Sequence, residues 1–150
     1  MILLDDTGYD HIKSDVIGFI SLARSSNKQD PRSHLLIVLT SGFIYVSGQI
    51  PYTPENKPLS ENPTIAEQAE QVIQNVSNIL EASNSSLNHI VKANIFLTDM
   101  KTQFGEFNGV YAKYFSDHKP ARSCVAVKEL PLGVDLEMEV VAVEKDDQKL

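Results

Sequence analysis

Two strand-like runs near the C-terminus carry charge where a buried strand would carry none. The first contains Arg122, and the second contains Asp135, Glu137 and Glu139 at alternate positions. A guanidinium offers a planar fork that binds a carboxylate at two points, and a nearby acid can orient or deprotonate a water molecule. One interpretation of these residue types is therefore a site for a small anion that reacts with water.

The alternation of side chains along a strand indicates how these charges are placed. In the second run Leu136 points opposite to Glu137, and in the first run Arg122 shares a face with Cys124. A hairpin connected through residues 128–131 would set Arg122 opposite Glu137, on the sheet face away from the helices. The same register also fits a structural interpretation, in which the two residues form a cross-strand ion pair on a solvated face. Such a pair would stabilise the fold by roughly 0.2–1 kcal/mol. The pattern alone leaves both interpretations open.

Three further positions are candidate site residues. Gly48 ends a strand-like run, where a glycine permits close approach of a ligand or another strand, although a bulge explains it as well. Asn108 is a polar amide in a helix dominated by aromatics, and it needs partners if it is buried. Cys124 is disfavoured as a nucleophile, because no histidine lies near it in sequence and a buried thiol is inert.

Composition limits the class of protein. The 150 residues match one ordinary domain. A net charge of -7 without a basic block argues against nucleic-acid binding, which needs clustered Lys and Arg. A single cysteine excludes an internal disulfide, and the four histidines are too scattered to suggest a metal site. We therefore expect no metal and no nucleic-acid partner.

Targeting signals are weak. No apolar run approaches the roughly 18 residues that a membrane span needs, so we expect a soluble protein without a membrane partner. The opening "MILLDDTGYD" lacks a signal-peptide pattern, and its acids are untypical of a mitochondrial transit peptide. The expected compartment is the cytoplasm or the mitochondrial matrix.

The middle of the chain shows clear secondary-structure patterns. The runs "LLIVL" and "FIYVSGQI" predict a hairpin, and the proline-rich residues 51–63 predict a loop. Thr64 and Glu67 form a capping box at the start of a helix that reaches about Ala82. Residues 89–99 then read as a buried strand. Residues 103–115, "QFGEFNGVYAKYF", read as a helix whose aromatic stripe belongs in the core.

The order of these elements, two strands, helix, strand, helix and two strands, predicts an α+β fold with two helices on one face of a sheet. We assign residues 34–150 to a single domain and residues 1–33 to an atypical, poorly ordered N-terminal segment, in which residues 1–24 are either weakly helical or disordered. Small side chains beside Arg122 leave the far face of the sheet only half polar, which favours packing against another subunit.

Four segments resemble the RidA/YjgF family of enamine and imine deaminases, particularly its fungal members. They are "YVSGQIP", "NIFLTDM", "FNGVYAKYF" and "PARSCVAVKELPLGVDLEMEVVAV", within about residues 42–145. The resemblance implies a chorismate-mutase-like α+β fold and a homotrimer with active sites between subunits. It also implies hydrolysis of small anionic enamine or imine acids, such as 2-aminoacrylate and 2-iminobutanoate, to 2-keto acids and ammonia. The reaction protects pyridoxal-phosphate enzymes and needs no cofactor.

The resemblance assigns roles by position. Arg122 would bind the substrate carboxylate, and Glu137 would position or activate the attacking water. Cys124 would line the site mainly through its backbone. The remaining pocket residues would be Ser47, Gly48 and Asn108.

One part of the family pattern is missing. Family members usually carry a "GPYSQA"-like segment whose tyrosine closes the pocket, whereas the position 13 residues before Ser47 is His34 in this chain. Loss of the tyrosine favours a second interpretation, a catalytically weak trimer that binds small carboxylates or acts like a chaperone. A third, the ribonuclease activity attached to relatives, is disfavoured by the acidic charge balance.

Overall fold

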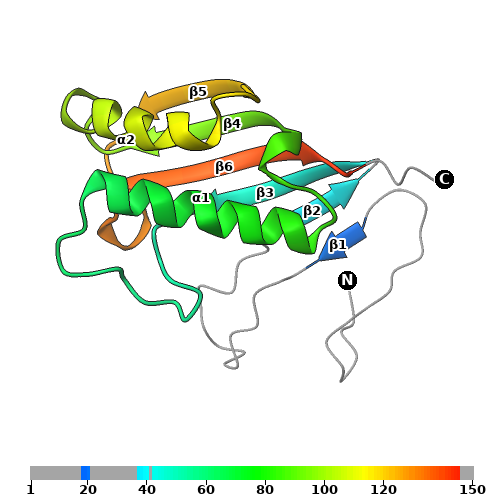
Figure 1. Ribbon diagram of the computed structural model, residues 1–150. Coiled ribbons are helices and arrows are strands. Elements are labelled where there is room, and N and C mark those ends of the chain that lie inside the picture. The colour runs from blue at the N-terminus through cyan, green and yellow to red at the C-terminus, as the bar shows by residue number, and fades with distance from the viewer. Residues whose placement is uncertain (1–17, 21–36, 41, 146–150) are drawn as a thin grey trace.

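Two helices cover one face of a mixed sheet in the computed structural model, which describes residues 18–20, 37–40 and 42–145 (Figure 1). The strands are β1 (Gly18–Ile20), β2 (Ile37–Thr40), β3 (Phe43–Gln49), β4 (Ile90–Leu97), β5 (Ala121–Ala126) and β6 (Leu136–Val143), and the helices are α1 (Ile65–Ala82) and α2 (Met100–Tyr114). Across the described sheet the order is β1-β2-β3-β6-β4-β5. The predicted α+β architecture, with both helices on one face, is confirmed.

The predicted hairpin at the start of the domain is confirmed. β2 and β3 pair antiparallel, with Thr40 opposite Phe43, and Gly42 adopts a φ of 79° in the turn between them. Glycine tolerates this left-handed conformation without a steric penalty. β1 adds a further antiparallel strand to β2, so residues 18–20 are extended where we expected a weak helix or disorder. The rest of the segment 1–33, including its proposed boundary, lies outside the described residues.

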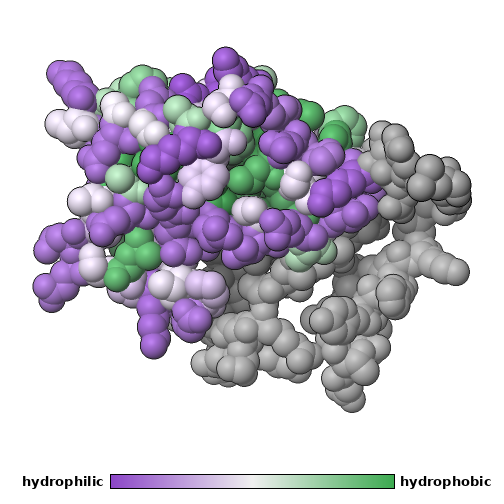
Figure 2. Space-filling view, in the orientation of Figure 1, coloured by the Kyte–Doolittle hydropathy of each residue, from purple (hydrophilic) through white to green (hydrophobic). Residues whose placement is uncertain are grey.

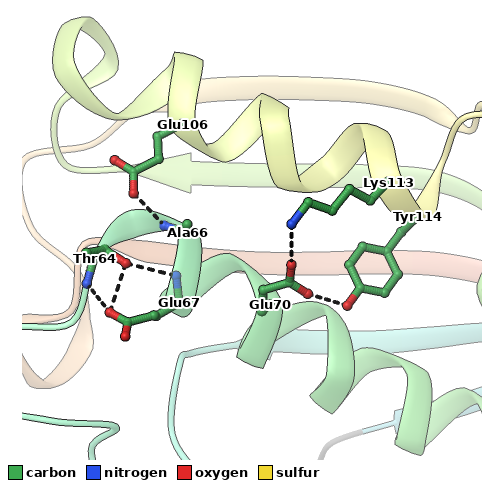
Figure 3. Close-up of polar contacts among 7 residues, drawn as sticks. All are labelled: Thr64, Ala66, Glu67, Glu70, Glu106, Lys113 and Tyr114. Carbon is green, nitrogen blue, oxygen red and sulfur yellow. Dashed lines mark hydrogen bonds and ion pairs between the residues drawn. The ribbon is translucent and has the colours of Figure 1, made fainter.

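The helix α1 begins and ends where local side chains satisfy its free backbone groups. Thr64 Oγ1 accepts a hydrogen bond from the Glu67 backbone N–H at 3.2 Å, and Glu67 Oε2 accepts one from the Thr64 N–H at 2.7 Å (Figure 3). This is the predicted capping box. At the other end Ser83 Oγ donates to the Ile79 carbonyl at 2.8 Å. The face turned to the sheet is apolar, and its fully buried residues are Ala69, Val72, Ile73, Val76 and Leu80.

The helix α2 buries most of its predicted aromatic stripe. Phe107 and Tyr111 are buried, as is Phe115 directly after the helix, whereas Phe104 and Tyr114 are half-buried. The outward surface of the two helices is mostly hydrophilic, as Figure 2 shows. An amphipathic pair of this kind covers a sheet while its other side faces water.

Polar contacts join the two helices (Figure 3). Glu106 Oε1 accepts a hydrogen bond from the Ala66 backbone N–H at 2.9 Å, which satisfies a free donor in the first turn of α1. Nearer the other end of α2, Lys113 Nζ lies 2.9 Å from Glu70 Oε1, and the Tyr114 hydroxyl donates to the same carboxylate. These contacts hold α2 against α1, and α2 lies near the β5 edge of the sheet (Figure 1).

The predicted hairpin between the last two strands is wrong. β4 lies between them: it pairs in parallel with β5, where Ala93 is opposite Arg122, and antiparallel with β6, where Phe96 is opposite Glu137. A parallel pair needs a crossover connection, and α2 supplies one between β4 and β5. The alternating pattern of the two runs fits an intervening strand as well as direct pairing, so the pattern could not distinguish them.

Candidate functional site

Arg122 lies on the helix-covered face of the sheet, not on the face away from the helices as the sequence predicted. Its partner in the register, Ala93, is fully buried and is itself opposite the buried Val140. Residues paired across neighbouring strands share a face, so Arg122 points toward the helix layer. Because β5 is an edge strand, the side chain is still exposed to solvent.

One side of α2 receives the guanidinium. Arg122 Nη1 donates a hydrogen bond to Asn108 Oδ1 at 2.7 Å. The Arg122 Cζ lies 4.6 Å from the centre of the Tyr111 ring and 5.8 Å from that of Phe104. Positions 104, 108 and 111 differ by four and three residues and therefore share one side of a helix. Asn108 thus has the partner that a half-buried amide requires.

Cys124 belongs to the same cluster. It is half-buried on β5 opposite the buried Ile95, and it shares the helix-covered face with Arg122. Burial raises the pKa of the Cys124 thiol, and the Arg122 guanidinium opposes this rise only in part. A raised pKa keeps the sulfur protonated at neutral pH, which agrees with a role in lining the site and not in nucleophilic attack.

A second cluster lies on the open face of the sheet. Glu137 is opposite Phe96, three residues along β4 from Ala93, so its side chain points away from the helices. A Cβ atom at Gly48 would lie 1.7 Å from Glu137 Oε1, so the carboxylate occupies the space that a side chain at position 48 would need. The pairing of β3 with β6 shifts register between Val46 and Gln49, and Gly48 lies within this irregular stretch.

The environment of Glu137 favours its protonated form. Burial raises the pKa of its carboxyl group, and the negative charge of Glu139 raises that pKa further. Glu139 is two residues along the same strand and accepts a hydrogen bond from Asn94 Nδ2 at 2.9 Å. A carboxyl group with a raised pKa is suited to accept and return a proton near neutral pH.

The candidate residues therefore form two groups. We call Asn108, Arg122 and Cys124 the arginine half-site, and Ser47, Gly48 and Glu137 the glutamate half-site. Ser47 is exposed and directly precedes Gly48. The two half-sites lie on opposite faces of one sheet, so the predicted pairing of Arg122 with Glu137 is wrong, and so is the cross-strand ion pair that depended on it.

The sequence interpretation missed the role of two aromatic residues. Phe104 and Tyr111 were assigned only to the core, yet both rings lie beside the guanidinium of Arg122. Their spacing from Asn108 on one side of a helix was a usable signal. What was missing was the position of β5 next to α2.

An open groove of about 570 Å³ lies beside α1 and contains no half-site residue; its lining is Leu59, Ser60, Ala66, Glu67, Glu70, Gln71, Gln74 and Tyr114. Within the described ranges, no group of three or more His, Cys, Asp or Glu side chains could hold a metal ion. No helix in the same part of the chain is long and apolar enough to cross a membrane.

The fold and the site define the structural class of this protein: a small α+β domain with two helices on one face of its sheet and an exposed arginine in contact with one of these helices. The chain belongs to the Endoribonuclease L-PSP family, whose model matches residues 30–144. It is 59% identical over 132 residues to the mitochondrial protein MMF1 of Saccharomyces cerevisiae, covering 86% of this chain and 89% of that protein.

Solved structures agree with this assignment. The crystal structure of yeast Mmf1 matches with a TM-score of 0.72 and 64% identity over 76% of this chain and 89% of that chain. A RidA from an Antarctic Psychrobacter bacterium matches with a TM-score of 0.68 and 37% identity over 73% and 87% of the two chains. The resemblance to RidA proteins and their fungal members is confirmed, and the match extends further toward the N-terminus than residue 42. His34, the position at which we expected the family tyrosine, lies outside the described residues.

Proposed function

We propose that this protein hydrolyses reactive enamine and imine acids, of the 2-aminoacrylate and 2-iminobutanoate type, to 2-keto acids and ammonia. The observation that carries the proposal is the arginine half-site. Arg122 is exposed, and its guanidinium is held at 2.7 Å by Asn108. Its remaining N–H groups are directed to no carboxylate of the described chain, and two-point binding of a substrate carboxylate is the chemistry for which a guanidinium is suited.

The reaction needs few groups. With the carboxylate held by Arg122, a protonated imine carbon is electrophilic enough for water to add to it. Glu137 accepts a proton from the attacking water and returns it to the nitrogen of the carbinolamine that forms. The C–N bond then breaks as Glu137 takes up the hydroxyl proton, and this proton leaves with the ammonia as ammonium. The C=N bond and one water are converted to a C=O bond and ammonia. Orientation and one acid/base group therefore suffice without a cofactor.

The separation of the half-sites supports an assembly of several chains. A small substrate cannot contact Arg122 and Glu137 of one chain, because the sheet lies between them. The open sheet face also exposes apolar side chains: Tyr45 is 45% and Val125 is 46% exposed, and Phe43 beside Tyr45 is 41% exposed. Such a surface is typical of a subunit contact. We propose a homotrimer in which each site combines the arginine half-site of one subunit with the glutamate half-site of the next.

Mixing two inactive variants tests this arrangement. Arg122→Ala and Glu137→Ala chains are each expected to be inactive, but trimers formed from both should contain some sites with both native residues. In a cyclic trimer that contains both chains, one of the three sites holds both native residues, so the mixed trimers should show about a third of wild-type turnover per site. Co-expression with two different tags, followed by tandem purification, isolates the mixed trimers for the assay. Mixed trimers without activity would show that the site is not shared between chains.

The activity itself is tested in a coupled assay. Threonine or serine is supplied with its pyridoxal-phosphate-dependent dehydratase, and release of keto acid and ammonia is followed with and without this protein. We expect faster release with the protein present. If an intact assembly gives no acceleration, the proposed hydrolysis is wrong.

That negative result would favour the second candidate, a trimer that binds small carboxylates with little turnover. The observation behind this candidate is His34 in place of the family tyrosine. The ribonuclease activity in the family's description is not our proposal, because a net charge of -7 opposes binding to phosphates. Salt-dependent RNA binding would contradict that choice.

The name of yeast MMF1 places that protein in mitochondria, and we propose the mitochondrial matrix for this chain as well.

Glu137 should set the acid limb of the pH–rate profile. Because burial and Glu139 raise the pKa of Glu137, its basic form is lost at a higher pH than for an ordinary glutamate. Turnover should therefore fall as the pH decreases through this raised pKa. Glu139→Gln removes the repulsion but keeps an acceptor for Asn94, so the limb should move to lower pH. The exposed Glu144→Gln, beyond the end of β6, is the control, and an unmoved limb in Glu139→Gln would contradict this role.

A further inference from the structure

The guanidinium of Arg122 is restrained in two different directions. Asn108 Oδ1 accepts a hydrogen bond from Nη1 at 2.7 Å, and the centre of the Tyr111 ring lies 4.6 Å from Cζ. A hydrogen bond to a guanidinium lies in its plane, whereas a ring at this distance attracts the cation over the ring face. Together the two contacts restrict both the tilt of the guanidinium and its rotation. Arg122 is otherwise an exposed side chain on an edge strand, and such a side chain is usually mobile.

The ring of Tyr111 is packed between buried aromatic side chains. The residue is only 8% exposed, and its ring stacks on that of Phe115, with 4.3 Å between ring centres and 26° between planes. Phe107 packs against the same ring in a tilted arrangement at 5.6 Å. A ring fixed by two buried aromatic neighbours is a rigid surface for a cation. The packing of the core thus extends directly to the arginine half-site.

The hydroxyl group does not explain why Tyr111 lies there. It is buried and makes no hydrogen bond to any of the described residues. An unpaired buried hydroxyl costs free energy, so its presence does not stabilise the fold. The part of Tyr111 that contacts the half-site is the aromatic ring.

We propose that Tyr111 is a positioning residue for carboxylate recognition: its ring fixes the plane of the Arg122 guanidinium, so that the N–H groups not used by Asn108 meet a planar carboxylate at two points. This inference rests on the proposed function, because it assumes that Arg122 receives the substrate carboxylate. It predicts that loss of the ring weakens substrate binding and leaves the water-activating glutamate half-site unaffected. The effect should therefore fall on KM and on carboxylate affinity, with little change in kcat.

The probe is 2-oxobutanoate, a keto acid of the product type, whose binding to the assembled protein is measured by titration calorimetry. In Tyr111→Leu we expect the affinity to fall about 2- to 30-fold, the range given by the strength of a cation–π contact. Tyr111→Phe keeps the ring and should restore most of the affinity. Turnover of the imine, measured in parallel, should show a raised KM in Tyr111→Leu. If Tyr111→Leu does not fold, Tyr111→Met keeps the buried volume and replaces it.

A matched control separates positioning from general loss of packing. Phe115→Leu removes a buried aromatic ring of similar size from the same stack, whereas the described rings over which the Arg122 guanidinium lies are those of Tyr111 and Phe104. Thermal unfolding should show both leucine variants destabilised. The loss of affinity should be clearly larger in Tyr111→Leu, because Phe115→Leu leaves the ring beside Arg122 in place. Unchanged affinity in Tyr111→Leu, or an equal loss in Phe115→Leu, would overturn the inference.

The same experiment distinguishes this inference from the proposed function. If the wild type binds 2-oxobutanoate but does not accelerate imine hydrolysis, the proposed reaction is wrong, and the affinities of the variants still decide the role of Tyr111. If the wild type does not bind the keto acid, then Arg122 is not a carboxylate site and this inference is overturned as well.

Discussion

Arg122→Ala should abolish turnover and leave the chain folded. The side chain is exposed, and its contacts among the described residues include one hydrogen bond to Asn108 and the rings of Tyr111 and Phe104. Substitution of an exposed residue usually changes stability by about 0.5 kcal/mol or less. A two-point contact with a carboxylate involves hydrogen bonds of roughly 1.5–3 kcal/mol each, so its loss should lower kcat/KM by about 10²- to 10⁴-fold.

Two controls make this result specific. Lys119→Ala removes a different exposed cation just before β5 and should have no effect on turnover. Arg122→Lys keeps the charge but loses the planar fork, so its activity should lie between those of the wild type and the alanine variant. The assay is the coupled release of keto acid, with circular dichroism and native mass as measures of folding and assembly. An Arg122→Ala chain that failed to fold would show that the arginine is primarily structural.

Gly48→Ala should remove most of the activity by displacing the carboxylate of Glu137. The new Cβ would lie 1.7 Å from Glu137 Oε1 and 2.7 Å from its Cδ, which is far closer than non-bonded atoms approach. Because a buried strand moves less readily than a side chain, we expect the carboxylate to be displaced. General acid–base catalysis contributes about 10²- to 10⁴-fold, so turnover should fall by an amount in that range. Binding of 2-oxobutanoate should be affected much less, since the Arg122 of the proposed site belongs to the neighbouring subunit and keeps its contacts with Asn108 and Tyr111.

A glycine in an open position provides the control. A Cβ atom added at Gly105 in α2 would meet no atom of a neighbouring element within 4 Å. Alanine is favoured over glycine in a helix by roughly 0.5–1 kcal/mol. Gly105→Ala should therefore be slightly more stable and fully active.

A double variant tests whether the clash is the cause. In a Glu137→Ala background the obstructing carboxylate is absent, so adding Gly48→Ala should cost little further stability. The two changes would then be clearly non-additive in unfolding experiments. Full activity in the single Gly48→Ala variant would show that the position of Glu137 does not matter for catalysis.

Local patterns predicted the secondary structure correctly where it depends on interactions between residues close together in the sequence. The capping box of Thr64 and Glu67 and the apolar spacing up to Ala82 predicted α1, because caps and helical periodicity depend on residues three or four positions apart. The turn at Gly42 predicted the β2–β3 hairpin for the same reason. In β6, alternation correctly separated the buried Leu136 from Glu137.

The same alternation failed for β5, because it says which side chains share a face but not which strand lies alongside. With Arg122 expected on the face away from the helices, Val125 three residues later would point toward the helices, yet it is 46% exposed and is opposite Phe96 on the open face. The short connection to β6 resembled a hairpin, whereas the chain places β4 between the two strands. Inserting that strand reverses the expected faces of Arg122 and Val125.

From residue 37 onward, the types of the main elements and the residues that carry the proposed chemistry could be predicted from the chain alone, since these follow from local periodicity and from motifs that resemble the family. The grouping of these residues depends on the three-dimensional fold. The strand order separates Arg122 from Glu137, the register shift in β3 accompanies the close contact of Gly48 with Glu137, and the packing of α2 sets Tyr111 beneath the guanidinium. Each of these depends on contacts between residues far apart in the chain, which no local pattern encodes.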